Sequence, residues 1–222
     1  MRLGLRDLVP PLVLKGQRWL RRRASRAQAT AAGQQEADYY DRVYGQSEEY
    51  LRHYADSVYY PSWTVLVDRM RRAGCQRILD VGCGPGQFAA LLHDAGFTDY
   101  QGLDFSGRAI EMAQRRVPDF RFAVGDAQKS DLLGQAGFDV VVSLEFLEHI
   151  EPDLEILARV RPGTLVLASV PNFPSHSHVR HFTSAEAVAE RYGPLFEDLR
   201  VDAVRLNARG TALYLLEGHR RG

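Results

Sequence analysis

From residue 77 to the end of the chain, short apolar runs alternate with longer amphipathic segments. Short apolar runs bounded by turn residues are typical of buried strands. Amphipathic segments such as 107–116 and 151–159 lie between most of these runs, which is the order expected when helices connect parallel strands. The pattern predicts strands at 77–81, 100–104, 120–124, 138–143 and 163–169.

Two further apolar runs, 198–204 and 211–217, are separated by only a few residues. So short a connection can join antiparallel strands but not parallel ones. We therefore expect an α/β fold, a Rossmann-like, seven-stranded and mostly parallel sheet with helices on both faces and a terminal antiparallel hairpin. Ligands of such sheets bind beyond the carboxyl ends of the strands, which is where candidate residues should be sought.

The chain before residue 77 divides by composition into two parts. Residues 1–35 are predicted to form a basic arm and linker, and 36–222 a single domain. The domain would begin with a tyrosine-rich helical cap over 36–70, in which Tyr39, Tyr40 and Tyr44 are candidates for lining a ligand pocket. The alternative is that many of these tyrosines pack the segment onto the sheet.

Charge is distributed unevenly, although the whole chain has 28 basic and 28 acidic residues. Residues 1–35 contain eight basic residues and one acidic residue, and the remainder contains 20 and 27. An acidic body argues against broad binding of nucleic acid. In residues 1–23 arginines alternate with Leu and Trp, which is compatible with peripheral membrane contact or with a solvated arm.

The early apolar run 8–14 is too short to cross a bilayer, and the arginines follow it rather than precede it as in a signal peptide. Two cysteines, Cys75 and Cys83, form neither a disulfide framework nor a zinc set. We expect a cytoplasmic location, with the arm as a candidate contact to the inner membrane surface. The sequence does not define an oligomeric state.

The first predicted strand ends in Asp80 and is followed by glycine at positions 82, 84 and 86. Glycines allow a sharp turn and the close approach of a ligand to the backbone. A dinucleotide-binding GxGxxG loop would have glycine where Gln87 stands, and Asp80 would be poorly placed beside a pyrophosphate. This carboxylate suits a ligand with an ammonium group and no phosphate, which points to S-adenosylmethionine.

The pattern Asp-x-Gly-x-Gly-x-Gly resembles motif I of the class I S-adenosylmethionine-dependent methyltransferases, and the similarity extends from about Tyr39 to Glu217. Asp104, at the end of the second predicted strand, can accept hydrogen bonds from both ribose hydroxyls. Asp126 resembles the acid that contacts the adenine amino group. The expected cofactor-binding residues are Tyr39, Tyr44, Asp80, Gly82, Gly84, Gly86, Asp104, Phe105, Asp126, Ala127 and Glu145.

If a helix begins after the fourth predicted strand, Glu145, Glu148 and His149 share one face. This spacing is similar to the Glu-x-x-Glu-His element of metal-dependent O-methyltransferases, which implies a Mg²⁺ or Mn²⁺ site. Of the nearby histidines, His181 fits best as a fourth ligand. Acidic residues are also favoured at helix starts without any metal. In that case His149, His178 or His181 is expected to act as general base.

Several histidines near the expected methyl donor favour methylation of a hydroxyl, which needs help to lose its proton. The expected acceptor is a small molecule or a sugar, including a glycan precursor of polysaccharide biosynthesis. No nucleic acid partner is expected. Two alternatives remain at this point. They are a nicotinamide-dependent reductase on a similar fold and a cofactor-binding module without catalytic activity.

Overall fold

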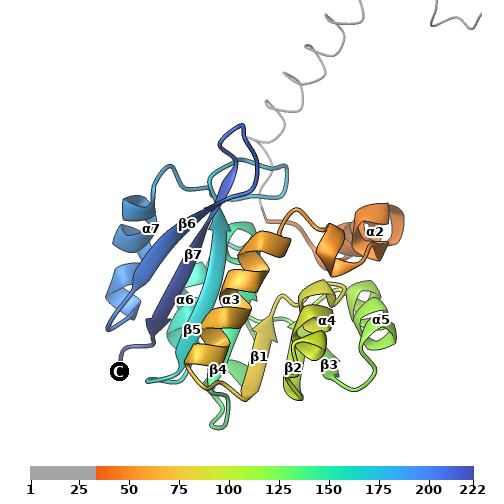
Figure 1. The fold of residues 1–222 in the computed structure, drawn as a ribbon, viewed down its shortest axis with the longest axis horizontal. Coiled ribbons are helices and arrows are strands. Elements are labelled where there is room, and N and C mark those ends of the chain that lie inside the picture. The colour runs from red at the N-terminus through yellow and green to blue at the C-terminus, as the bar shows by residue number, and fades with distance from the viewer. Residues whose placement is uncertain (1–33) are drawn as a thin grey trace, which may run out of the picture.

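The computed structural model describes residues 34–222, and within them a single seven-stranded sheet has the order β3-β2-β1-β4-β5-β7-β6 (Figure 1). The first five strands in this order, β3, β2, β1, β4 and β5, are parallel. Strand β7 runs antiparallel to both β5 and β6. The predicted fold class is therefore confirmed, including the terminal hairpin. The strands are β1 (Arg77–Val81), β2 (Asp99–Asp104), β3 (Arg121–Val124), β4 (Val140–Leu144), β5 (Leu165–Pro171), β6 (Arg200–Arg205) and β7 (Ala212–His219).

Helices cover both faces of this sheet. Apolar side chains of α3 and α4 pack on one face, and those of α6 and α7 pack on the other. The α-helices are α2 (Ala37–Gln46), α3 (Tyr60–Arg72), α4 (Gln87–Asp94), α5 (Gly107–Arg116), α6 (Asp153–Arg159) and α7 (Ala185–Tyr192). Short 3₁₀ helices are η2 (Glu48–Leu51), η3 (Tyr54–Asp56), η4 (Asp131–Gly134), η5 (Leu147–His149) and η6 (Gly193–Leu195).

The side chains of the central strands point alternately to the two faces of the sheet, which explains why helices cover both faces. In β1, Ile78 joins the cluster beneath α3 and α4, whereas its neighbour Leu79 joins the cluster beneath α6 and α7. Both side chains are fully buried. Successive side chains of a strand point to opposite faces, so a strand covered on both faces appears in the sequence as a continuous apolar run.

The strands begin and end within two residues of the predicted bounds, and two departures in the helices have local reasons. Helix α6 begins at Asp153 rather than at 151, directly after Pro152. Proline disfavours helical backbone at the residue before it, so Glu151 stays outside the helix. No α-helix begins directly after β4, because Glu145 has φ 51° and only the short turn η5 forms before α6. A left-handed backbone at a non-glycine residue interrupts helix geometry.

The tyrosine-rich segment 36–70 does not form one continuous cap. Helix α2 lies over the carboxyl ends of the strands, near α5 (Figure 1). By contrast, α3 belongs to the body of the domain, because its Trp63, Leu66 and Met70 are buried against the sheet. The segment therefore divides into a cap and a core helix.

The basic arm and its expected membrane contact, residues 1–23, lie outside the described residues. Within residues 34–222, no helix combines the length and the apolar character needed to cross a bilayer.

Candidate functional site

A cavity of about 420 Å³ lies at the carboxyl ends of the parallel strands. Its walls come from α2, the glycine loop after β1, the ends of β2 and β4, and the loop after β5. Strand order reverses at β1, since β2 lies on one side of it and β4 on the other. Crevices at such reversals are the usual ligand sites of open α/β sheets, so the topology and the cavity agree.

The glycine loop forms the floor of this cavity through Gly82 and Gly84. Both have positive φ, 78° and 52°, and a Cβ on Gly82 would lie 2.5 Å from Cδ2 of Phe146. Gly86 differs. It does not line the cavity, and a Cβ there would meet the backbone Cα of Ala113 in α5 at 3.0 Å. The expected cofactor contact of Gly86 is therefore corrected, because this glycine allows the loop to pack against α5.

Two carboxylates at the ends of β1 and β2 are buried on the cavity wall. Asp80 is 2% exposed, and its Oδ2 accepts a hydrogen bond of 2.7 Å from the Tyr100 hydroxyl. Asp104 accepts hydrogen bonds of 2.9 Å from the N–H groups of Gly84 and Ser106. Asp104 thus connects the glycine loop to the start of α5.

Burial changes the acid–base behaviour of both groups. Desolvation raises the pKa of Asp80 to about 7, with a further increase from the nearby Asp104 and a partial decrease from the Tyr100 hydrogen bond. Desolvation likewise raises the pKa of Asp104 to about 6, opposed by its backbone hydrogen bonds. A cation beside these carboxyls would restore the ionised form.

Asp126 and Ala127 follow β3 and line the cavity with Phe105, as expected for the far end of a nucleoside site. The Asp126 carboxylate also contacts residues of its own turn. Its Oδ1 accepts the Gln128 N–H at 2.8 Å and its Oδ2 lies 3.2 Å from Lys129 Nζ. This residue stabilises its own turn as well as facing the cavity.

Helix α2 contributes an aromatic wall from Tyr39, Tyr40 and Tyr44. The Tyr40 ring contacts Phe105 and meets His149 edge-on, with centroid distances of 5.3 and 5.9 Å. The Tyr44 hydroxyl lies 3.4 Å from the position of a Cβ on Gly84. Helix α2 therefore touches both the glycine loop and the histidine region.

Besides these aromatic contacts, one carboxylate of α2 makes hydrogen bonds to the body of the domain. Asp41 Oδ1 accepts hydrogen bonds from the Ser106 hydroxyl at 2.5 Å and from the Arg108 N–H at 3.2 Å. Ser106 is the N-cap of α5, whose amide groups favour negative charge. The cap is thus joined to the body of the domain at the start of α5.

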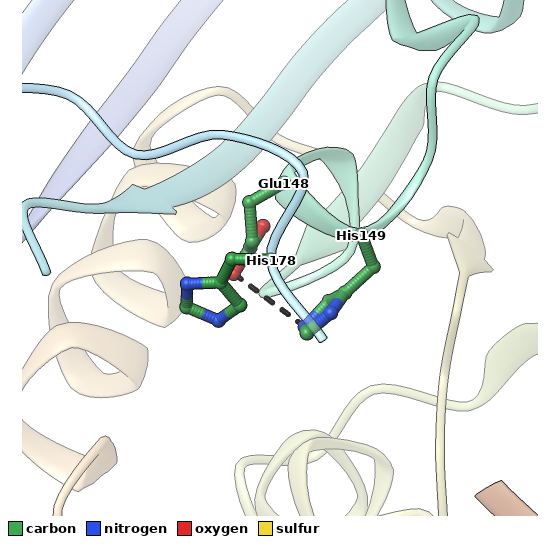
Figure 2. A group of neighbouring side chains, drawn as sticks. All are labelled: Glu148, His149 and His178. Atoms are coloured by element: carbon green, nitrogen blue, oxygen red, sulfur yellow. Dashed lines mark ion pairs between the residues drawn. The ribbon is translucent and has the colours of Figure 1, made fainter. Parts of the chain in front are cut away.

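Glu148, His149 and His178 form the most distinctive cluster of the described residues, with possible ligand atoms all within 4.8 Å of one another (Figure 2). Glu148 is fully buried, and neither of its carboxylate oxygens has a hydrogen-bond partner. His149 Nε2 lies 3.9 Å from Glu148 Oε1. Both histidines line the cavity, and Glu148 lies behind them.

The two histidines share one arrangement of hydrogen bonds. Nδ1 of His149 lies 3.0 Å from the Ser177 carbonyl, and Nδ1 of His178 lies 3.1 Å from the Phe173 carbonyl. A carbonyl only accepts, so each Nδ1 bears the proton and each Nε2 keeps a free lone pair. Desolvation, together with the nearby His178, lowers the pKa of His149 to about 4 despite the bond to Ser177. His149 is therefore neutral at physiological pH.

Two expectations about this cluster are corrected. His181 is exposed and lies outside the group, and His178 occupies the place expected for it. Glu145 lines the cavity but is not one of the grouped ligands. Its carboxylate accepts a hydrogen bond of 2.9 Å from the Ser169 hydroxyl. Burial raises the pKa of Glu148 well above its usual value, and the charge of Glu145 raises it further.

Sequence reasoning missed the residues that fix the cap segment after α2. The Gln87 side chain donates to the carbonyls of Glu49 and Arg52 at 3.3 and 3.2 Å. Arg116 donates to the carbonyls of Pro85 and Tyr50 at 2.5 and 2.7 Å. The one available signal was Gln87 itself, which replaces a glycine of the dinucleotide pattern.

Comparison with known proteins adds independent evidence. Residues 78–163 match the family model described as a methyltransferase domain. A ubiquinone biosynthesis O-methyltransferase of Thiobacillus denitrificans is 28% identical over 130 residues, 55% of this chain and 56% of that protein. An uncharacterised methyltransferase of Mycobacterium bovis is 35% identical, over 55% of this chain and 64% of its own length. The chain thus spans between half and two thirds of these curated relatives.

Among solved structures, the fold is similar to that of a Burkholderia thailandensis 1,6-didemethyltoxoflavin-N1-methyltransferase with bound S-adenosylhomocysteine. The TM-score is 0.59 at 22% identity, covering 75% of this chain and 80% of that one. The segment matched by the family model begins within β1 and includes the glycine loop, Asp104, Glu148 and His149, but ends before His178. Together, the sheet order, the glycine loop and these matches show a methyltransferase domain over residues 78–163 and a chain with the fold of the class I S-adenosylmethionine-dependent methyltransferases.

Proposed function

We propose that this protein transfers the methyl group of S-adenosylmethionine to a hydroxyl of a small molecule or of a sugar, such as a glycan precursor. The main support is the cluster of Glu148, His149 and His178 beside the glycine loop, where two neutral imidazoles face the cavity with free Nε2 atoms. A sulfonium provides its own leaving group, so the protein has to align the acceptor and remove its proton. Hydroxyl acceptors need the removal of a proton more than amines, which are already nucleophilic.

The proposed cofactor position follows the strand ends. Asp80 would accept the ammonium group of the cofactor, and the backbone at Gly82 and Gly84 would lie against its methionine part. Asp104 would accept the ribose hydroxyls, as acids at this position do in related folds. Asp126, with Ala127 and Phe105, would surround the adenine. Tyr39, Tyr44 and Glu145 would complete the enclosure.

Two observations support a divalent metal at the cluster. Both carboxylate oxygens of Glu148 are buried without any hydrogen bond, which costs free energy unless a cation or a proton lies beside them. Both histidines donate Nδ1–H to a backbone carbonyl, the arrangement that orients most metal-ligating histidines. Glu148, His149 and His178 would hold Mg²⁺ or Mn²⁺, and of these two ions the imidazole ligands favour Mn²⁺, because Mg²⁺ prefers oxygen ligands. A bound metal would lower the pKa of the acceptor hydroxyl.

Without a metal, the same residues can still assist. His149 Nε2 would accept the proton of the hydroxyl, and Glu148 Oε1, 3.9 Å away, would lie beside the imidazolium that forms. The aromatic side chains Tyr39, Tyr40 and Phe173 would shape the acceptor side of the cavity and exclude water. Metal use and general-base use therefore predict different responses to chelation.

The deciding experiment is a screen of hydroxylated acceptors, including phenols and nucleotide sugars, read out as S-adenosylhomocysteine and run with and without EDTA. We expect activity that EDTA removes and Mn²⁺ restores, and that H149Q lowers by at least about a hundredfold. The control is H53Q, since His53 lies outside the cavity lining. Activity insensitive to EDTA would contradict the metal. Binding of S-adenosylmethionine without turnover of any hydroxyl, but with turnover of amines, would contradict the acceptor class.

A further inference from the structure

The loop between β5 and α7, residues 172–184, contains His178 but has no helix or strand of its own. Glu148 and His149 come instead from η5, on a different part of the chain. An irregular loop has many conformations available to it. The geometry of the cluster therefore depends on whatever fixes this loop to η5.

Backbone contacts provide part of that attachment. The Val179 N–H donates to the carbonyl of Glu148 at 2.8 Å, directly beside His178. The Ser177 carbonyl lies 3.0 Å from His149 Nδ1, as described above. Both contacts are single hydrogen bonds, each of which contributes roughly 1 kcal/mol. They set the register of the loop, and a stronger contact lies next to them.

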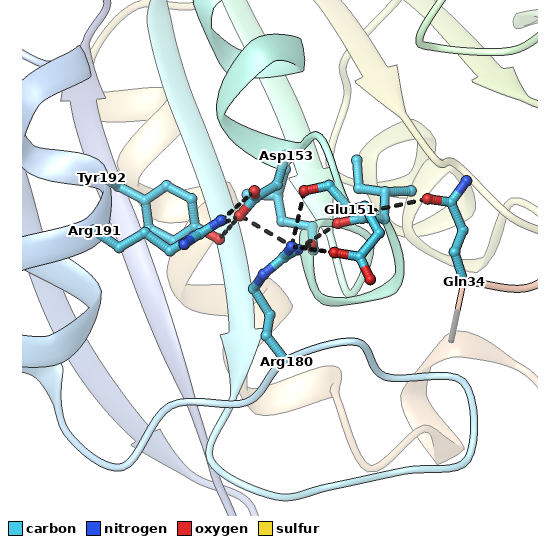
Figure 3. A network of polar contacts seen from close by, with 8 residues as sticks. Gln34, Glu151, Asp153, Arg180, Arg191 and Tyr192 are labelled. Atoms are coloured by element: carbon cyan, nitrogen blue, oxygen red, sulfur yellow. Dashed lines mark hydrogen bonds and ion pairs between the residues drawn. The ribbon is translucent and has the colours of Figure 1, made fainter. Parts of the chain in front are cut away.

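That contact is the guanidinium of Arg180, whose side chain is 14% exposed. It donates to the carbonyls of Leu147, of Ile150 at 2.5 Å and of Glu151 at 3.0 Å (Figure 3). These carbonyls surround η5 and the turn after it, and carbonyls at the end of a helical turn lack partners within the turn. One planar group thus binds both ends of the segment that bears Glu148 and His149.

The guanidinium is itself held in place. Asp153 is 1% exposed, and its Oδ2 lies 3.4 Å from Arg180 Nη1. The same carboxylate receives two hydrogen bonds from Arg191, at 2.9 and 2.6 Å, and one of 2.7 Å from the Tyr192 hydroxyl. Figure 3 shows Arg180 and Arg191 converging on Asp153 from two different segments. A buried carboxylate with this many partners fixes orientation more than it adds stability.

We propose that Arg180 is a positioning residue, which holds the 172–184 loop on η5 and thereby sets His178 beside Glu148 and His149. This inference rests on the proposed function, in which that cluster assists removal of the acceptor proton. The planar fork is the essential feature, because it reaches three carbonyls at once. A lysine at the same position would keep the charge but lose the fork.

The test compares R180K and R180Q with R220K as the matched control. Arg220 also donates to backbone carbonyls, those of Leu157 and Ala158, but it lies at the opposite end of β5 from the cavity. The first readout is the set of histidine ring signals in NMR spectra of the whole protein, with those of His149 and His178 assigned by single substitution. The second is the affinity for Mn²⁺ measured by electron paramagnetic resonance. The third is the affinity for S-adenosylmethionine.

We expect R180K and R180Q to shift the ring signals of His149 and His178 and to weaken Mn²⁺ binding by at least about tenfold, with cofactor affinity nearly unchanged. R220K should leave all three readouts as in the wild type. Unchanged ring signals in a folded R180K protein would overturn the proposal. So would a shift in R180Q alone, which would assign the effect to charge, or an equal loss of cofactor affinity, which would assign it to the general fold.

The ring signals also separate this proposal from the proposed function. If the wild-type protein binds no Mn²⁺ and methylates no hydroxyl, the proposed function fails. The comparison of ring signals between R180K and R220K still tests whether Arg180 positions His178.

Discussion

Burial favours the neutral form of the Asp80 carboxyl group. A cationic ligand beside it would favour the ionised form. Its pKa of about 7 in the free protein puts this balance within the physiological range. The Tyr100 hydroxyl occupies Oδ2 and leaves the other oxygen for a ligand. A cofactor with an ammonium group should therefore compete directly with protons for this residue.

The affinity for S-adenosylmethionine should accordingly depend on pH. Between pH 7 and 5.5 we expect the Kd to rise by up to about tenfold per pH unit, because Asp80 must first lose its proton. D80N should bind S-adenosylmethionine weakly, and its Kd should show no change centred near pH 7. The control is D99N, which removes an exposed partner of Arg121. Calorimetric titrations from pH 5.5 to 7.5 make the comparison, and a constant wild-type Kd would contradict the assignment.

Gly86 provides a second test at this scale. Its φ is 75°, and an added Cβ would lie 3.0 Å from the Cα of Ala113. G86A should therefore lower the free energy of unfolding by about 1–3 kcal/mol while changing cofactor affinity little. G84A is the comparison, since Gly84 faces the cavity. Thermal unfolding and cofactor titration separate the two effects. A large loss of affinity in G86A with an unchanged Tm would contradict the packing role.

At this scale the sequence predicted the groups that lie next to strand ends and failed for the others. Asp80 and Asp104 follow from the rule that ligands bind beyond the carboxyl ends of parallel strands. Gly86 was misassigned because a glycine needed for a ligand and one needed for a neighbouring helix look alike in sequence. His178 was not distinguished from His181, since the loop between them has no periodicity to indicate which side chain faces inward.

Among the α-helices of residues 34–222, α2 alone has no buried residue, which makes its attachment to the body of the domain the weakest. None of its residues is fully buried, and it contacts the domain through its aromatic side chains and Asp41. Its position therefore depends on a few polar contacts at the start of α5. Elements with little buried apolar surface are the first to open locally.

Removing the charge of Asp41 should loosen this helix. We expect D41N to weaken attachment by about 1 kcal/mol, which corresponds to roughly a fivefold weaker cofactor affinity. Amide hydrogen exchange should increase in α2 and η2 but not in β1 or β4. D38N is the matched control, because Asp38 lies on the exposed side of the same helix. Equal exchange in both variants would show that Asp41 does not hold the cap.

The sequence predicted most of these elements because strands covered on two faces form continuous apolar runs. It did not predict η5, because the left-handed backbone at Glu145 leaves no signal in the residue type. It also merged α2 and α3, since the tyrosine-rich composition of 36–70 gave no indication that Trp63 and Met70 belong to the core.

For the whole molecule, the decisive feature is the reversal of strand order at β1, which opens one cavity to several strand ends at once. The glycine loop, the ribose-binding candidate and the histidine cluster come from distant segments and meet only there. A ligand that spans the cavity therefore connects α2, the sheet and the loop after β5, and should stabilise the folded state as a unit.

Cofactor at a hundred times its Kd should stabilise the fold by about 2.7 kcal/mol. For a domain of this size, that corresponds to an increase in Tm of roughly 5–11 °C. S-adenosylhomocysteine should act similarly, whereas NADH should not, since Asp80 would face its pyrophosphate. Differential scanning calorimetry provides the measurement. A shift with NADH and none with S-adenosylmethionine would contradict the cofactor assignment.

The contact between Tyr44 and the glycine loop has a consequence for the time course of the proposed reaction. With the Tyr44 hydroxyl 3.4 Å from the place of a Gly84 Cβ, the cap and the loop enclose the ligand from opposite sides. A spent cofactor of nearly the same shape would leave only when α2 moves. The rate of product release would then depend on how often α2 opens, so the few contacts that hold the cap would also limit how fast the proposed reaction turns over.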